Sequence, residues 1–270
     1  GSGSLRDLPW RRTNDPWRVL VSEVMLQQTS VARVMPKYDV FLEAFPTPEA
    51  LAQASLGDAL RLWSGLGYPR RCRNLQATAV VLHEQFNGRM PSSLDELLVL
   101  PGIGQYTARA VLAFAHRIDV AVVDVNVSRV LSRLEGVPMK ARALQELADE
   151  LIPEGLAWEW NQVMMDFGAR HCTVRSPQCD SCPVRSQCRY KGVGEDPAQL
   201  SAGVSKPQAR FEGSDRQARG RAMKAVSSGA MNINDVVEAM RVEEQRALAL
   251  IASLVNEGLL QRTDAIITLP

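Results

Sequence analysis

The sequence lacks the features that mark membrane, secreted and disordered proteins. No apolar run approaches the roughly 20 residues that a membrane-spanning helix needs, and we recognise no secretion signal. Five cysteines among 270 residues are too few for a disulfide framework, and an odd number is typical of a reducing compartment. Because 46% of the residues are hydrophobic and 23% are charged, we expect a globular cytoplasmic protein with one large domain or two ordinary ones.

The sequence also has almost no net charge, +1, which argues against a protein that is basic over its whole surface. The charges are nevertheless unevenly distributed. Residues 61–80 contain four arginines and no acid, whereas residues 141–160 contain five acids and one arginine. A local basic excess can attract a phosphate backbone to one face of a protein, although a solvated helix face gives the same pattern.

Helical spacing of apolar residues recurs over residues 5–192, and no alternation is sustained long enough for a sheet. We therefore predict an all-α first domain over these residues. Its predicted helices include residues 17–31, which follow the start signal Asp15-Pro16, and residues 71–86. Short connections between such helices are typical of all-α folds.

The composition changes after residue 192. Residues 193–212 are rich in Pro, Gly, Ser, Ala and Gln, and we predict a linker there. Residues 213–270 have the pattern of three helices followed by a β-hairpin over residues 259–269. This order predicts a small C-terminal winged-helix-like α+β module.

Four of the five cysteines lie within 17 residues near the end of the first domain, with the spacing C-x6-C-x2-C-x5-C. Thiolates this close in sequence can bind one metal centre. An iron–sulfur cluster fits the spacing better than zinc, because zinc ribbons usually pair two C-x2-C hooks and only one is present. Zinc is the alternative. The predicted ligands are Cys172, Cys179, Cys182 and Cys188.

A turn that contains two glycines joins two helical stretches of the first domain. Gly102 and Gly104 permit left-handed backbone and the close approach of a partner, and the amides that open the next helix can donate to an anion. The pattern is that of a helix–hairpin–helix that binds a DNA phosphate, or of a plain turn between helices. About twenty residues later Asp124 follows a β-branched run, where an acid can cap a helix or act in catalysis.

Together these features resemble the helix–hairpin–helix DNA glycosylases that include endonuclease III. Residues 22–29, Ser-Glu-Val-Met-Leu-Gln-Gln-Thr, are similar to the signature of the MutY-type adenine-DNA glycosylases of this superfamily. Three shorter segments, residues 8–10, 63–68 and 164–168, also fit that type. The resemblance covers residues 5–192 and implies an all-α glycosylase core whose four clustered cysteines bind a 4Fe-4S cluster.

The resemblance implies catalytic roles for four residues. Asp124 matches the catalytic aspartate of the superfamily, and Asn126 matches an asparagine beside it. Glu23 matches the acid that protonates N7 of adenine. Tyr106 stands where bifunctional relatives carry a Schiff-base lysine, which implies a monofunctional enzyme. These residue types suit the chemistry, because cleavage of an N-glycosidic bond needs one protonated carboxyl to activate the base and one ionised carboxylate to stabilise the sugar cation.

The resemblance also implies how DNA is bound. The target base must leave the stack before it can react, and residues 26–28 match the segment that fills the gap it leaves. The glycine turn would hold phosphates. The expected DNA-binding residues are Leu26, Gln27, Gln28, Tyr68, Arg70, Gly102 and Gly104.

Two features depart from the MutY type. Tyr68 is followed by Pro69, where the family usually has a second aromatic residue that intercalates beside 8-oxoguanine. Nothing after residue 196 resembles the β-rich, Nudix-like domain that many members carry, and the predicted winged-helix-like module takes its place. The resemblance therefore implies glycosylase activity more directly than it implies a preferred opposite base.

The sequence predicts a monofunctional DNA glycosylase of base excision repair that removes adenine mispaired with 8-oxoguanine or G. Its expected partner is double-stranded DNA with a mispaired adenine, and we expect a monomer that binds no membrane and, in a bacterium, associates with the nucleoid. A thymine or uracil glycosylase acting at G mispairs shares most of the same motifs. A non-catalytic sensor of DNA damage is the third alternative.

Overall fold

The computed structural model describes residues 5–203 and 210–270, and these residues are mainly helical, as the sequence predicts. They divide into two compact units that are discontinuous in sequence. The first contains residues 5–20, 92–98 and 103–203, and the second contains residues 21–91, 99–102 and 210–270. Each unit is described by itself. The predicted boundaries at residues 192 and 213 follow sequence order and stay a prediction. The predicted linker lies partly outside the described residues, since residues 204–209 are not among them.

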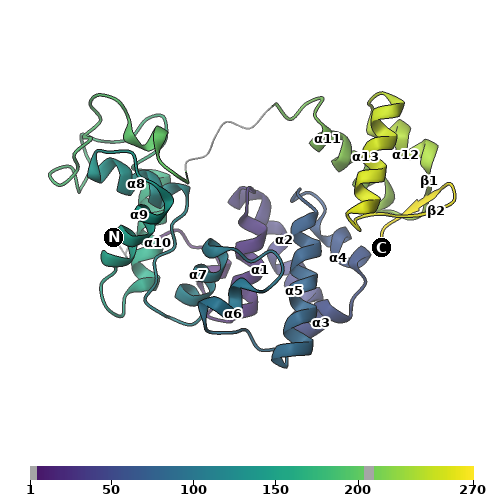
Figure 1. The fold of residues 1–270 in the computed structure, drawn as a ribbon, viewed down its shortest axis with the longest axis horizontal. Coiled ribbons are helices and arrows are strands. Elements are labelled where there is room, and N and C mark those ends of the chain that lie inside the picture. The colour runs from purple at the N-terminus through teal and green to yellow at the C-terminus, as the bar shows by residue number, and fades with distance from the viewer. Residues whose placement is uncertain (1–4, 204–209) are drawn as a thin grey trace. The chain divides into compact units, whose positions relative to one another are not determined.

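The first unit contains a 3-10 turn, the start of α1 and most of the central helices. Its elements are η2 (Pro9–Arg11), the first residues of α1 (Pro16–Leu26), α6 (Leu94–Leu98), α7 (Gln105–Phe114), α8 (Val125–Glu135), α9 (Ala141–Glu150), α10 (Ala157–Arg170) and η3 (Pro197–Leu200). Helices α8, α9 and α10 form one group in Figure 1. Helices α8 and α10 pack closely because Gly168 has no side chain, and a Cβ there would lie 2.6 Å from the Cβ of Asn126.

The second unit contains the rest of α1, the helices that follow it up to α5, and the C-terminal helices and strands. Its elements are α2 (Val31–Ala44), α3 (Pro48–Gln53), α4 (Leu56–Trp63), α5 (Arg70–Phe86), α11 (Asp215–Val226), α12 (Ile233–Met240), α13 (Glu244–Asn256), β1 (Met231–Asn232), β2 (Gln261–Thr263) and β3 (Ile266–Thr268). Thr47 and Ser55 accept hydrogen bonds from backbone amides at the starts of α3 and α4, as N-cap residues do. Phe41 and Trp63 are buried in edge-to-face contact at the core.

The C-terminal residues form the predicted α+β module. Three helices and the β2–β3 hairpin occur where the sequence predicts them, and β1 adds a third antiparallel strand in the order β1–β3–β2 (Figure 1). Strand β1 was not predicted because two residues carry no alternating pattern. The end of the chain packs on α4, since the amide of Gly57 donates to the carbonyl of Pro270 at 2.8 Å.

One predicted helix is wrong in extent. The helix expected over residues 17–31 ends at Leu26, and α2 begins at Val31 after a turn. The backbone of Gln28 is left-handed there, with φ of 55°, which ends the helical path. Helix α2 was not among the predicted helices, and Pro36, a residue that usually interrupts a helix, lies inside it.

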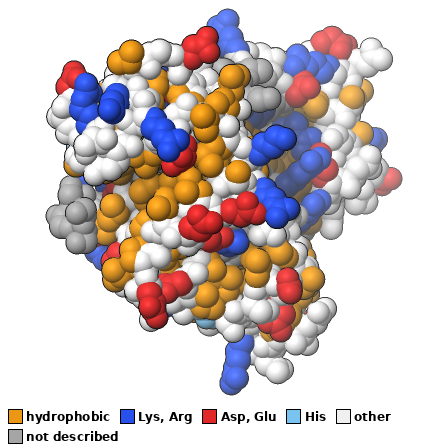
Figure 2. Space-filling view, turned by 60° about the vertical axis from the view of Figure 1, so that its left-hand side comes forward, with side chains coloured by type: hydrophobic (Ala, Val, Ile, Leu, Met, Phe, Trp, Pro, Cys, Tyr) orange, Lys and Arg blue, Asp and Glu red, His pale blue; other side chains and the backbone are white. Residues whose placement is uncertain are grey.

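The surface shows both signs of charge and many apolar side chains. In the space-filling view, several Lys and Arg side chains gather right of centre, while other charged groups are spread over the visible face (Figure 2). The near-neutral total therefore hides local groups of one sign. Among the described residues, the structure contains no helix of the length and apolar character required for a membrane span.

Candidate active site and cysteine cavity

Asp124 is the N-cap of α8, and its carboxylate is fully engaged by the first turn of that helix. One oxygen, Oδ1, accepts hydrogen bonds from the amides of Asn126 at 2.8 Å and Val127 at 2.7 Å. The other, Oδ2, accepts from the side-chain amide of Asn126 at 2.7 Å. The capping role and the predicted catalytic role are therefore compatible, because the cap fixes the carboxylate at the helix start.

Burial and hydrogen bonding act on the Asp124 pKa in opposite directions. Burial raises it, while the bonds from Val127 and Asn126 and the charge of Arg129 lower it, and the net effect is a pKa above the usual value of an aspartate. The ionised form nevertheless has three donors around it. A carboxylate held in this way can stabilise positive charge without first reorganising.

Arg129 connects Asp124 to the loop that carries the cysteines. It donates to the side-chain oxygen of Asn126 at 2.8 Å, which turns the Asn126 amide nitrogen toward Asp124. Its other donors reach the carbonyls of Gly168 at 2.6 Å and Cys172 at 2.6 Å. Sequence reasoning missed Arg129. The sequence does contain one signal, because Arg129 follows Asn126 by three residues and therefore shares a helix face with it. In the structure Arg129 is buried, with 4% exposure, and a buried charge needs partners.

Tyr106 lies in the first turn of α7, in the same unit as Asp124, and is half-buried.

The two glycines of the turn before α7 differ in backbone conformation. Gly102 has φ of 76°, and a Cβ there would lie 2.8 Å from the Cβ of Asn74, so this position requires glycine. Gly104 is the N-cap of α7 with extended backbone, and no left-handed conformation requires a glycine there, contrary to the sequence argument.

Glu23 lies in α1 in the second unit and is buried, with 6% exposure. This excludes the interpretation that it is an ordinary acid on a solvated helix face. Leu26 ends α1, and Gln27 and Gln28 form the turn that follows. Arg71 stabilises the end of α1 just before this turn, because it donates to the carbonyls of Val24 at 2.6 Å and Met25 at 2.9 Å.

The loop before α5 has an unusual backbone. Gly65, Gly67 and Tyr68 all have positive φ, and Tyr68 at 49° is not a glycine. Arg71 stabilises this loop as well, since it donates to the carbonyls of Leu66 and Gly67 at 3.1 Å, and its guanidinium lies over the Tyr68 ring. Burial lowers the pKa of Arg71 to about 10. The segment predicted to face the opposite base is therefore held by a half-buried cation.

The four predicted metal ligands line one cavity in the first unit. Its walls also include Val130, Arg133, Phe167, His171 and Tyr190, and the ligands themselves are Cys172, Cys179, Cys182 and Cys188. Gly192, at φ of 83°, passes so close that a Cβ would lie 2.9 Å from the sulfur of Cys179. The fifth cysteine, Cys72, is buried in the other unit, and burial raises its pKa.

Arg133 holds the start of the cysteine loop in place. It is 2% exposed and forms an ion pair with Asp196 at 2.6 Å. It also donates to the sulfur of Cys172 at 3.3 Å and to the carbonyl of Thr173 at 2.7 Å. Burial alone would lower the Arg133 pKa, but the bonds to Asp196 and Cys172 raise it above the usual arginine value. Sequence reasoning did not single out Arg133.

The structure thus groups the predicted site residues in two sets. The first unit contains Asp124, Asn126, Tyr106, Gly104 and the four cysteines. The second contains Glu23, Leu26, Gln27, Gln28, Tyr68, Arg70 and Gly102. In each set an arginine supports the predicted residues, the buried Arg129 in the first and the half-buried Arg71 in the second.

The chain is similar to known proteins over most of its length. The family model described as HhH-GPD superfamily base excision DNA repair protein matches residues 21–154. Adenine DNA glycosylase of Mycolicibacterium smegmatis is 41% identical over 267 residues, which cover 96% of this chain and 89% of that protein. The adenine DNA glycosylase of Homo sapiens is 39% identical over 213 residues, which cover 73% of this chain and 39% of the human protein.

Solved structures show the same fold. A thermostable thymine-DNA glycosylase matches with a TM-score of 0.66 and 32% identity over 69% of this chain and 89% of its own. Endonuclease III in a non-covalent DNA complex matches with a TM-score of 0.63 and 27% identity over 70% of this chain and 89% of its own. The predicted helix–hairpin–helix glycosylase fold is confirmed. The chain belongs to the adenine DNA glycosylase family, within the HhH-GPD superfamily of base excision DNA repair proteins.

Proposed function

We propose that this protein removes adenine from A:8-oxoguanine and A:G mispairs in duplex DNA by hydrolysis of the N-glycosidic bond. The observation that carries the proposal is the buried Glu23 within residues 22–29, in a chain 41% identical to an adenine DNA glycosylase over nearly its full length. A carboxyl that carries a proton can act as a general acid. It can then give that proton to a purine ring nitrogen.

The two acids divide the chemistry. Glu23 donates its proton to N7 of adenine, the bond between C1′ and N9 breaks, and its electron pair leaves with the base. Positive charge develops on the sugar, and the ionised carboxylate of Asp124 stabilises it. Water then adds to C1′ and releases a proton. The donors from Asn126 and Val127 hold Asp124 in its ionised form through these steps.

The products are adenine and an abasic site, without strand cleavage. Tyr106 supports this, because a phenol cannot form the imine that a lysine amine forms with the opened sugar. Residues 26–28 fill the gap left by the extruded adenine, and the turn at Gly102 and Gly104 binds phosphate. Tyr68 and Arg70 are further expected contacts to the DNA. We propose that the protein acts as a monomer.

We also propose that the four cysteines hold a 4Fe-4S cluster. The donor set is all sulfur, because the four cysteines line one cavity. Zinc needs all of its ligands at about 2.3 Å from one point, whereas each thiolate of a cluster can bind a different iron. When bound, the cluster supplies a cross-link over residues 172–188. Absorbance near ~400 nm would support the iron–sulfur cluster. Elemental analysis that found stoichiometric zinc and no iron would contradict it.

Single-turnover excision tests the function. The duplexes carry A, T or U opposite G or 8-oxoguanine and are otherwise identical. We expect adenine removal to be fastest, with no strand nicking before alkali treatment. Faster removal of thymine or uracil from G mispairs would instead favour the second candidate function, which the structural match to a thymine-DNA glycosylase brings into consideration.

A further inference from the structure

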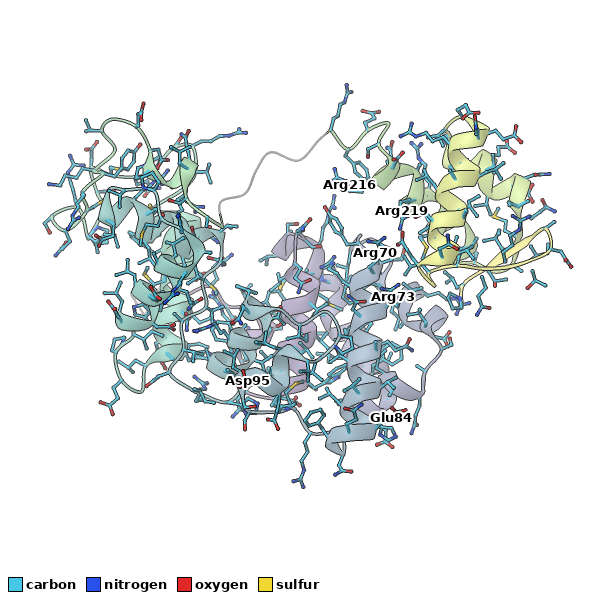
Figure 3. The ribbon with its side chains drawn as sticks, in the orientation of Figure 1. Arg70, Arg73, Glu84, Asp95, Arg216 and Arg219 are labelled. Atoms are coloured by element: carbon cyan, nitrogen blue, oxygen red, sulfur yellow. The ribbon has the colours of Figure 1, made fainter. Side chains whose placement is uncertain are left out.

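Three arginines from distant parts of the second unit converge on one residue of the C-terminal module. Arg70 of α5 and Arg219 of α11 both donate to the same carboxylate oxygen of Glu257, each at 2.6 Å. Arg73 donates to the backbone carbonyl of Glu257. Figure 3 shows Arg70 and Arg73 on α5 near Arg216 and Arg219 on α11. Helices α5 and α11 are therefore joined through a single acidic residue.

A fourth arginine extends this group toward the loop before α5. Arg216 lies one turn before Arg219 on α11, and its guanidinium donates to the hydroxyl of Tyr68 at 3.3 Å. Arg70 and Arg73 are likewise one turn apart on α5. Residues three apart on a helix share a face. We call Arg70, Arg73, Arg216 and Arg219 the arginine seam.

The charges of the seam favour an additional anion. Two of its guanidinium groups, those of Arg70 and Arg219, share the single carboxylate of Glu257, whose pKa is lowered to about 2, chiefly by the hydrogen bond from Arg70. Like charges one turn apart on a helix repel each other. The side chain of Arg70 is 62% exposed, so a ligand in solvent can reach the seam.

The seam is also held in place before any ligand binds. The amide of Gly57 donates to the carbonyl of Pro270, and Arg61 donates to the carbonyl of Ser227 at 3.2 Å. These contacts fix the C-terminal module on α4 independently of the seam. A preformed cationic surface loses little conformational entropy when it binds.

We propose that the arginine seam is a binding surface for the phosphodiester backbone of duplex DNA, formed jointly by α5 and the C-terminal module. Guanidinium groups match phosphate oxygens in geometry as well as charge. The contact between Arg216 and Tyr68 places the surface beside a residue already proposed to contact DNA. This inference rests on the proposed function, because it gives the C-terminal module a part in binding the same substrate.

Binding of an undamaged 20-base-pair duplex at several salt concentrations tests the seam. Each phosphate contact contributes about 0.9 to the slope of log affinity against log salt concentration. We expect Arg216→Ala to lower the slope by about 0.9 and to weaken binding several-fold at low salt, and Arg216→Lys to keep the slope. Lys224→Ala is the matched control, because Lys224 is exposed on the same helix and outside the seam.

Glu257→Gln gives a test of opposite sign. It removes the negative charge that repels phosphate while keeping a side chain that accepts hydrogen bonds, so the affinity for the duplex should rise. If the seam only attaches the module, Glu257→Gln and Arg216→Ala will lower the melting temperature and leave the salt slope at the wild-type value. That outcome overturns the proposal.

Excision by the wild-type protein separates the two proposals. If wild type removes adenine but Arg216→Ala has an unchanged salt slope, the seam proposal fails and the proposed function stands. If wild type removes no adenine but the slope falls in Arg216→Ala, the proposed function fails while the phosphate-binding surface stands.

Discussion

Each unit contains an arginine that holds an irregular loop, the buried Arg133 in the first and the half-buried Arg71 in the second, and the two are neutralised in different ways. Arg133 in the first unit pairs with the carboxylate of Asp196 and also donates to carbonyls of the cysteine loop. Arg71 in the second unit donates to carbonyls and to the hydroxyl of Thr29, and its guanidinium lies over the rings of Trp63 and Tyr68.

The difference follows from what each arginine has to hold. Arg71 binds the last carbonyls of α1, which carry the negative end of the helix dipole and have no partner within the helix. The carbonyls of the cysteine loop that Arg133 contacts are not aligned in a helix, so they form no such dipole. The carboxylate of Asp196 stabilises the Arg133 cation there. A buried cation can thus be balanced by aligned dipoles or by an ion pair.

The two acids of the proposed mechanism extend this comparison to catalysis. Glu23→Gln should lower the single-turnover rate of adenine excision by about a thousandfold, because glutamine cannot donate the proton to N7. Duplex binding should stay within a few fold. Loss of binding together with a lower melting temperature would show that Glu23 is structural.

Asp124→Asn should lower the same rate by about a hundred- to a thousandfold, because the sugar cation loses its charged stabiliser. Asparagine caps helices as well as aspartate does, so α8 should keep its start and the melting temperature should barely change. Circular dichroism and thermal unfolding check this point. An excision rate within tenfold of wild type would remove Asp124 from the mechanism.

Replacement of these two arginines by methionine should lower the stability by different amounts. Arg133→Met leaves the half-buried carboxylate of Asp196 without its ion-pair partner and should lower the free energy of unfolding by about 3 kcal/mol. Arg71→Met leaves only neutral acceptors unsatisfied and should cost about 2 kcal/mol. Urea unfolding of both variants measures the difference. Equal losses would mean that the ion pair adds nothing beyond its hydrogen bonds.

The smallest expected effect is a shift in pH dependence. Since Asp124 must be ionised, the excision rate should fall as the pH drops through its raised pKa, above the usual aspartate range. Asn126→Ala removes a side-chain bond that lowers this pKa, so the acidic limb should move to still higher pH. The pH profile of the single-turnover rate measures the shift. A limb that moves to lower pH would contradict the assigned hydrogen bond.

Much of the local structure could be predicted from the sequence. Helical spacing and capping residues predict helices over residues 56–63 and 233–240, and α4 and α12 have these bounds. The end of α1 could not be predicted, since Arg71, 45 residues after Leu26, supplies the donors that the last turn lacks. Arg129 and Arg133 were missed for the same reason, because their partners lie in another part of the chain.

By itself, the sequence determined the helical class, the four clustered cysteines and the two candidate acids, because spacing along the chain is enough to specify local structure and a chelating loop. Only the tertiary structure decided that Arg129 donates to the carbonyls of Gly168 and Cys172, and that α5 and α11 share Glu257. Those arrangements join residues from separate elements, and the energy of burying a charge beside its partner depends on distance in space, which residue spacing does not specify.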